Sequence, residues 1–245
     1  MSAPVRLPIM PPPIDQLWHT LLDLQERLTS PWSVVGGQMV LLHAIEHGQQ
    51  PLAISQDGDV IADIRADQTA LTAIVAELEG LGFTLAPPSA DGIAHRYVRD
   101  AEPKPVVIDV LAPEGVGTRA DLRTSPPGRT IEVPGGTQAL SRTELITVIH
   151  EDRTGSLPRP DLLGAMIGKA AATSLPEPDR HYRDLALLLS LVEDPFTLAD
   201  ELKPKDRQRL RTAGKRLNDE HPAWALVPAD IRPNGQATLA ILTTQ

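Results

Sequence analysis

The stretch Ser55-Gln56-Asp57-Gly58-Asp59 leads directly into an apolar run over residues 60–64 that has the composition of a buried strand. In an extended chain, residues i and i+2 point to the same side, so Asp57 and Asp59 would present two carboxylates about 7 Å apart along one face. Paired carboxylates are suitable ligands for Mg²⁺, which also binds substrate phosphates. The alternative is an ordinary solvent-exposed Asp-Gly-Asp turn.

A third acidic residue, Asp109, interrupts a second apolar strand predicted over residues 106–111. A lone carboxylate among aliphatic neighbours is costly to bury unless it is paired or binds a metal. If the two strands are neighbours, Asp57, Asp59 and Asp109 form a triad that can hold two divalent ions. We therefore predict that the three carboxylates converge around Mg²⁺, and an exposed position for Asp109 at a sheet edge is the alternative.

Gly36-Gly37 stands between a short apolar run over residues 33–35 and an apolar segment over residues 39–45 that predicts a buried helix. Glycine permits a sharp turn and a close approach to a ligand. The N-terminus of the following helix would direct free N–H groups at an anion. The pattern predicts a phosphate cradle, with a simple turn as the alternative.

The wider pattern predicts an α+β protein in which an N-terminal mixed sheet flanked by helices is followed by a helical C-terminal domain. We predict a proline-rich arm over residues 1–13, an α/β domain over residues 14–150 and a helical domain over residues 151–245. The other expected elements are strands over residues 93–99 and 130–133, and helices over residues 14–28, 69–81, 161–172, 180–192 and 207–217.

Composition limits the class of protein. The 245-residue chain has no cysteine, which excludes disulfide frameworks, thiolate metal sites and cysteine nucleophiles. It contains no Gly-x-Ser-x-Gly sequence, so a serine hydrolase is poorly supported. No leader sequence is apparent and no apolar segment is long enough to span a membrane, so we expect a cytoplasmic protein without membrane association.

The net charge of −9 argues against non-specific coating of nucleic acid by the whole surface. Residues 203–216, however, contain seven basic residues and a single acid. On a helix, Arg207 and Arg211 share one face, which with Lys215 could bind an RNA backbone. A solvated charged helix is the more common explanation of such a run.

Taken together, these motifs resemble the DNA polymerase β-like nucleotidyltransferase superfamily, in which Gly-Gly begins a helix, an Asp-x-Asp pair follows and a third Asp lies in a later strand. The pattern is most similar to the AbiEii/MenT-type toxins of prokaryotic toxin–antitoxin systems. The likeness covers residues 32–191 and extends to Leu78-Glu79-Gly80-Leu81-Gly82-Phe83, His95-Arg96-Tyr97, Lys169 and Arg183-Asp184-Leu185.

The resemblance implies a nucleotidyltransferase fold and Mg²⁺-dependent transfer of a nucleoside monophosphate from an NTP to an acceptor hydroxyl. The leading acceptor is the 3′ end of tRNA, and a cognate antitoxin protein is the implied partner. The roles that it implies are metal binding by Asp57, Asp59 and Asp109, phosphate contacts from Gly36, Gly37 and Ser55, neutralisation of the triphosphate by Lys169, and orientation of Lys169 or the nucleophile by Asp184.

Two other functions stay open. An enzyme of similar fold could transfer the nucleotide to a small molecule or a protein side chain. A catalytically inactive nucleotide-binding module is the other, because residues 51–55 contribute Ser55 but no basic residue before the Asp pair, and Gly58 stands where an apolar residue is usual. His43 and His47 have the i, i+4 spacing of a metal pair, but no third ligand accompanies them, so a structural role is favoured.

Overall fold

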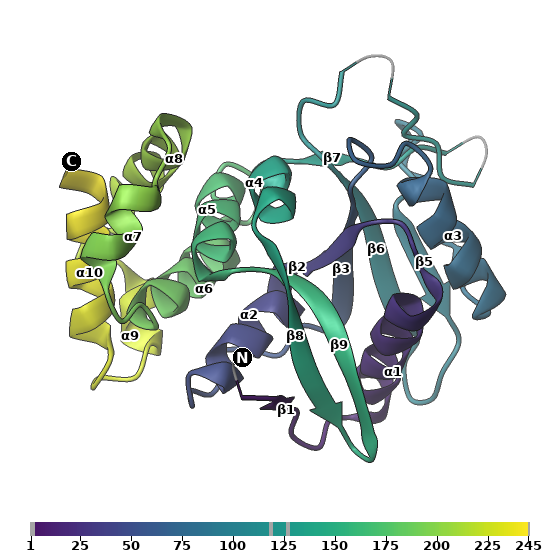
Figure 1. Ribbon diagram of the computed structural model, residues 1–245, viewed down its shortest axis with the longest axis horizontal. Coiled ribbons are helices and arrows are strands. Elements are labelled where there is room, and N and C mark those ends of the chain that lie inside the picture. The colour runs from purple at the N-terminus through teal and green to yellow at the C-terminus, as the bar shows by residue number, and fades with distance from the viewer. Residues whose placement is uncertain (1–2, 118–119, 126–127, 245) are drawn as a thin grey trace.

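A six-stranded mixed sheet forms the centre of the N-terminal half in the computed structural model, which describes residues 3–117, 120–125 and 128–244 (Figure 1). The strand order is β2 (Trp32–Val35), β3 (Asp57–Ala62), β6 (Val106–Pro113), β5 (Arg96–Arg99) and β4 (Thr84–Leu85), with β7 (Glu132–Val133) paired to β6. The central strands β3 and β6 run parallel, whereas β2, β4 and β5 pair antiparallel with their neighbours.

Helix α1 (Pro12–Arg27) and helix α3 (Ala70–Gly80) pack against this sheet, and the core that they share with it is mainly aliphatic, with a few aromatic side chains. α1 begins at prolines, which suit the first helical turn because its N–H groups have no partner within the helix. Its buried residues recur at helical spacing, including Ile14, Leu17, Trp18, Leu21 and Leu22. The helices predicted over residues 14–28 and 69–81 are confirmed within two residues at each end.

A second, three-stranded sheet contains β1 (Val5–Arg6), β8 (Thr143–His150) and β9 (Arg153–Pro160) in that order. These strands were not predicted from the sequence. β1 pairs parallel to β8, so part of the predicted proline-rich arm is a strand. The predicted boundary at residue 150 falls in the turn between β8 and β9, which pair along their whole length. The hairpin therefore stays with the N-terminal half, and the helical part begins after residue 160.

The C-terminal part is helical, as predicted, but it contains more helices than the sequence indicated. The three predicted helices form as α5 (Leu162–Ala172), α6 (Asp179–Ser190) and α8 (Pro204–Gly214), and the additional ones are α7 (Pro195–Glu201), α9 (Pro222–Leu226) and α10 (Arg232–Thr244). Gly235 lets α10 approach α6, because a Cβ there would lie 2.1 Å from Ser190 Oγ. Over the described residues the protein is thus an α+β fold with ten helices, and none of these is long and apolar enough to cross a membrane.

Helix α2 (Gly36–Glu46) joins the two halves because it is apolar on several sides. Leu41 and Leu42 belong to the core under the sheet, whereas Met39, Val40 and Ala44 belong to the core of the helical part. A helix that is buried all round in this way holds its neighbours at fixed distances. Its N-terminus is therefore a rigid point between the sheet and the C-terminal helices.

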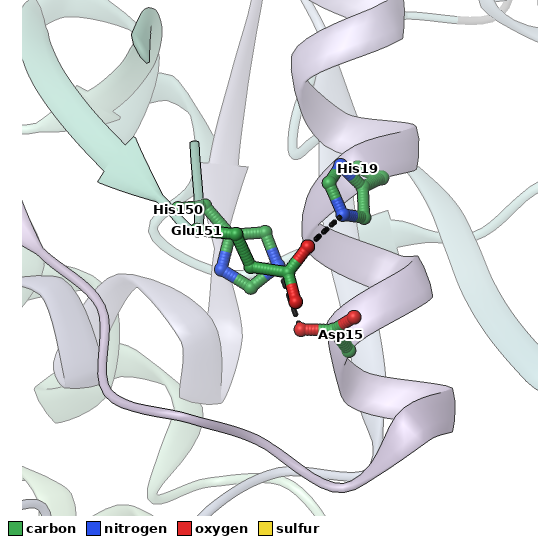
Figure 2. Close-up of side chains that lie close together, drawn as sticks. All are labelled: Asp15, His19, His150 and Glu151. Carbon is green, nitrogen blue, oxygen red and sulfur yellow. Dashed lines mark hydrogen bonds and ion pairs between the residues drawn. The ribbon is translucent and has the colours of Figure 1, made fainter. Parts of the chain in front are cut away.

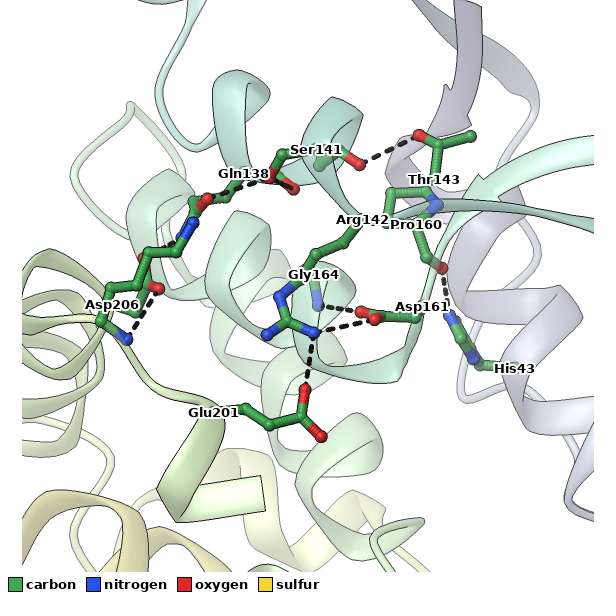
Figure 3. A network of polar contacts seen from close by, with 12 residues as sticks. His43, Gln138, Ser141, Arg142, Thr143, Pro160, Asp161, Gly164, Glu201 and Asp206 are labelled. Atoms are coloured by element: carbon green, nitrogen blue, oxygen red, sulfur yellow. Dashed lines mark hydrogen bonds and ion pairs between the residues drawn. The ribbon is translucent and has the colours of Figure 1, made fainter. Parts of the chain in front are cut away.

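Polar contacts add a second connection between the halves (Figure 3). Arg142 follows the short helix α4 (Gly136–Ser141), and its Nη1 lies 2.9 Å from Asp161 Oδ2 and 3.0 Å from Glu201 Oε2. Asp161 also accepts a hydrogen bond from the backbone N–H of Gly164 and so caps the N-terminus of α5. The buried Asp206 accepts a hydrogen bond from Gln138. These contacts orient α5, the helix that carries Lys169.

Candidate functional site

The parallel pairing of β3 and β6 brings the three predicted carboxylates together. Asp59 and Asp109 are direct partners in the register of the two strands, and Asp57 precedes Asp59 by two residues on the same side. Gly58 lies between them on the opposite face, where a Cβ would meet Leu17 of α1 at 2.7 Å. Close packing of α1 thus explains the glycine between the two acids.

The N-terminus of α2 lies directly against this carboxylate group. Gly36 has a φ of +67°, and a Cβ added to it would lie 1.8 Å from Asp59 Oδ2. A Cβ at Gly37 would lie 2.6 Å from Ser55 Cβ. Ser55 in turn donates a hydrogen bond of 2.6 Å to Asp57 Oδ1. The two glycines therefore allow the helix N-terminus, Ser55 and the acidic strand to come into contact, as the predicted cradle requires.

Arg96 is the main site residue absent from the predicted list. It lies on β5 opposite Asp109 in the strand register. Its Nε and Nη2 donate hydrogen bonds of 2.8 and 2.7 Å to the two oxygens of Asp109, and Nη2 lies 3.3 Å from Asp57 Oδ2. The hydrogen bonds that Arg96 donates to the Asp109 carboxylate raise the pKa of Arg96. The available signal was the His95-Arg96-Tyr97 sequence, but its register with Asp109 requires the fold.

The carboxylates repel one another despite Arg96. Burial, followed by the negative charges of Asp57 and Asp109, raises the pKa of Asp59 to about 7, while Lys169 and Arg180 act in the opposite direction. A carboxylic acid normally loses its proton near pH 4. The site therefore has a strong tendency to take up positive charge, whether a proton or a cation.

We expect the raised pKa of Asp59 to make the metal-free protein less stable as the pH rises from about 4 to about 7. Over this range the folded state holds a proton that the unfolded state has lost, so the free energy of unfolding falls, and above pH 7 the loss is complete. The fall is at most about 4 kcal/mol, at about 1.4 kcal/mol per pKa unit, and is smaller to the extent that water in the cavity screens the charges.

Urea unfolding of the wild type and of Asp59→Asn in EDTA, at several pH values, measures this effect. As the pH rises, the free energy of unfolding of Asp59→Asn should increase relative to that of the wild type. Asp100→Asn, at an exposed position beyond the end of β5, is the matched control. A difference between Asp59→Asn and the wild type that is constant with pH would contradict the assignment.

Helices α5 and α6 form the opposite wall. Lys169 Nζ lies 2.8 Å from Asp184 Oδ2, and Arg183 Nε lies 3.5 Å from Asp184 Oδ1. Lys169 is buried. Asp184 is thus in position to orient Lys169, which is one of the two roles that the resemblance implies for it. His181 also lines this wall; burial, together with the charges of Lys169 and Arg180, lowers its pKa to about 4, so the ring is neutral at pH 7.

A cavity of about 400 Å³ separates the two walls. It is lined by all eight residues predicted to bind metal or nucleotide or to act in catalysis: Gly36, Gly37, Ser55, Asp57, Asp59, Asp109, Lys169 and Asp184. The lining also includes His95, Arg96 and Arg183, which belong to the sequence stretches that carry the resemblance, and Arg180 and His181, which the sequence did not indicate. Arg180 and His181 lie one helical turn or less before the Arg183-Asp184-Leu185 sequence, but only the packing of α6 on α5 turns them into the cavity.

The predicted RNA-binding residues lie on or next to α8, outside this cavity. Arg207 donates to the carbonyl oxygen of Ala199 at 2.7 Å, and Arg211 donates to that of Thr243 at 3.0 Å. These two side chains therefore also hold α8 against α7 and α10. Lys215 is exposed at the end of α8.

The His43 and His47 pair is not arranged as a metal site. The buried His43 ring contacts the carbonyl oxygen of Pro160 at 3.0 Å, and His47 Nδ1 contacts the carbonyl oxygen of His43 at 2.8 Å. One nitrogen of each ring thus contacts a backbone carbonyl oxygen, which agrees with the structural role favoured from the sequence.

No model of a known protein family matches the chain, and no curated protein is significantly similar to it. What the protein does must therefore be inferred from the residues and charges of the cavity.

Proposed function

We propose that the protein is an Mg²⁺-dependent nucleotidyltransferase that moves a nucleoside monophosphate from an NTP to an acceptor hydroxyl. The observation that carries the proposal is the separation of charge across one cavity. The carboxylates of Asp57, Asp59 and Asp109 lie on the sheet side, and basic residues of α5 and α6 lie on the other. A metal-bound triphosphate carries the complementary arrangement, cation on one side and phosphate oxygens on the other.

The carboxylate triad suits Mg²⁺ because its ligand atoms are hard oxygens and because burial, together with the negative charges of Asp57 and Asp109, raises the pKa of Asp59, so that a bound cation would stabilise its charged form. Asp57, Asp59 and Asp109 would hold the metal. When bound, Mg²⁺ neutralises phosphate charge and lowers the pKa of a nearby hydroxyl.

The remaining lining residues bind and orient the substrate. Lys169 and Arg180 supply positive charge to the phosphates, and the N–H groups at the start of α2 lie beside the triad. The half-exposed guanidinium of Arg96 can turn from Asp109 toward a phosphate oxygen. In the reaction, the acceptor oxygen forms a bond to the α-phosphorus, the bond to pyrophosphate breaks, and the hydroxyl proton passes to a carboxylate. Positioning and charge neutralisation account for most of the rate enhancement in such transfers.

For the acceptor we propose the 3′ end of tRNA, with the protein acting in the cytoplasm as a toxin that a cognate antitoxin neutralises. This part rests on the sequence resemblance and on the basic stretch around α8. The exposed Lys205, Lys215 and Arg216 can still contact an RNA backbone.

Transfer of label from an NTP tests the proposal. The purified protein is incubated with Mg²⁺, total tRNA and each of the four α-labelled NTPs in turn. We expect label in the tRNA with at least one NTP, and loss of that label in EDTA. Label in a protein or a small molecule instead would support nucleotide transfer but identify a different acceptor.

Two further results would contradict an enzymatic function. Absence of labelled product with every acceptor, combined with equal Mg²⁺-NTP binding by the wild type and Asp57→Ala in calorimetry, would indicate an inactive binding module. Absence of both transfer and NTP binding would exclude any nucleotide function of the cavity.

A further inference from the structure

A second group of potential metal ligands lies at the far end of the β8–β9 hairpin (Figure 2). Asp15 and His19 stand one turn apart on α1, His150 is the last residue of β8, and Glu151 is the first residue of the hairpin loop. One ligand atom from each of the four lies within 4.8 Å of the ligand atoms of the others. Among the described residues that line the nucleotide cavity, none belongs to this group.

The four side chains form two contacts between an imidazole and a carboxylate. His150 Nε2 lies 2.9 Å from Asp15 Oδ1, and His19 Nε2 lies 3.2 Å from Glu151 Oε2. The centroids of the two imidazole rings are 4.7 Å apart. The contacts thus bring two nitrogen and two oxygen ligands from two separate segments to one point.

The His150 ring gives an independent indication of a ligand. Only 1% of the residue is exposed, and within the described part of the chain neither ring nitrogen makes a hydrogen bond. Nε2 is close to Asp15, but the direction of the contact does not meet hydrogen-bond geometry. A buried polar group without a hydrogen bond is costly. A cation between Nε2 and the Asp15 carboxylate would satisfy both groups.

The backbone of Glu151 is also unusual. It has a φ of +53°, in a two-residue hairpin loop in which glycine is normally preferred at such a position. This conformation is unfavourable for a residue with a side chain. In Figure 2 the Glu151 carboxylate is directed at His19. The loop therefore adopts an unfavourable conformation in which its acidic side chain reaches the group.

We propose that Asp15, His19, His150 and Glu151 form a binding site for a divalent transition-metal ion, with Zn²⁺ as the preferred occupant. Two imidazoles and two carboxylates suit Zn²⁺, whereas Mg²⁺ favours all-oxygen sites. Bonds of 2.0–2.2 Å in a tetrahedron place ligand atoms about 3.4 Å apart. The contacts of 2.9 and 3.2 Å are already near this spacing, and rotation of the exposed Glu151 can adjust the distances from its own carboxylate to the other ligands.

The metal would join the tip of the hairpin to α1. The hairpin pairs with β1, and its other end leads into α5, which carries Lys169. The role is therefore structural, because four protein ligands complete the tetrahedral shell of Zn²⁺ and leave no open position for a substrate.

Zinc binding by the full-length protein tests this proposal. The protein is stripped with EDTA, and Zn²⁺ is titrated in calorimetry with excess Mg²⁺ present to occupy the carboxylate triad. Bound zinc is also counted by elemental analysis. We expect one equivalent of Zn²⁺ in the wild type and in the triad variant Asp57→Asn. Binding of Co²⁺ in place of Zn²⁺ should give the visible absorption of a tetrahedral ion.

The variants His19→Gln, Glu151→Gln and His150→Gln each remove one ligand. Each should weaken Zn²⁺ binding by at least about 100-fold, since even loss of a residue that only supports a ligand costs 10–100-fold. His47→Gln is the matched control and should bind like the wild type. If His150→Gln fails to fold, His19→Gln and Glu151→Gln still test the site. Their side chains are more exposed, so replacing them disturbs the fold less.

Three results would overturn the site: no stoichiometric zinc in the wild type, unchanged affinity in His19→Gln and Glu151→Gln, or an equal loss in His47→Gln. The first two would identify the group as two ion pairs that hold the hairpin against α1. Loss of zinc binding in Asp57→Asn but not in His19→Gln would assign the ion to the triad instead.

Discussion

Asp109→Asn is expected to reduce nucleotide transfer by at least about 100-fold, comparable to or greater than the loss of one stabilising donor in an active site. The amide keeps the size of the side chain but removes the charge that a metal requires. Asp109 is only 5% exposed and accepts two hydrogen bonds from Arg96. The substitution therefore also releases Arg96 and leaves excess positive charge in the cavity. Initial rates of label transfer at saturating NTP measure the effect.

Asp100→Asn is the control for this prediction, because Asp100 lies in the loop that leads toward β6 and is exposed. It should retain wild-type rates. Circular dichroism and a urea midpoint must show that Asp109→Asn is folded. A folded Asp109→Asn variant with more than a tenth of the wild-type rate would remove Asp109 from the metal site.

Gly36→Ala is expected to lower the transfer rate by about 100-fold, the cost of displacing reacting groups by about 1 Å. The new Cβ would lie 1.8 Å from Asp59 Oδ2 and 2.9 Å from Asp59 Cβ. Rotation of the carboxylate cannot relieve the second contact, so β3 and the start of α2 must separate. The variant should also lose about 1–3 kcal/mol of unfolding free energy from overpacking, beyond the cost of a positive φ.

Gly48→Ala is a matched control at the other end of α2. Gly48 has a φ of +68°, almost the same as that of Gly36, but no atom lies within 4 Å of an added Cβ. The free energy of unfolding of Gly48→Ala should fall only by the conformational cost of about 1–2 kcal/mol, and the variant should keep its activity. Similar losses of activity in the two alanine variants would mean that contact with Asp59 is unimportant.

Much of the fold follows from local patterns. Helix α1 was predictable because its apolar residues recur on one side and prolines begin it. β6 was predictable because residues 106–111 are aliphatic except for Asp109. β9, with the sequence Arg-Thr-Gly-Ser-Leu-Pro-Arg-Pro, lacks such a signal. It is a strand because it pairs with β8 and packs against β2 and α1, and the contacts with β2 and α1 connect residues far apart in the chain.

The site divides in a similar way. The acidic wall was predictable because alternation along β3 puts Asp57 and Asp59 on one side, and a single acid in a strand such as β6 stands out. The basic wall was only partly predictable. Asp184 is one of several charged residues of α6, whereas Lys169 is the one charged residue of α5, and their ion pair depends on how α5 packs against α6. Arg96 reaches Asp109 only through the antiparallel register of β5 and β6.

The sequence by itself thus determined which side chains have the chemistry to bind a metal and a phosphate, because alternation in a strand and glycine at a helix start are local properties. The tertiary structure alone decided which charges face one another. It placed Arg96 on the carboxylates, directed Arg180 and His181 into the cavity, and brought Asp15 and His19 to the hairpin at His150. Such contacts depend on strand register and helix packing, which arise from burial of apolar surface over the whole chain.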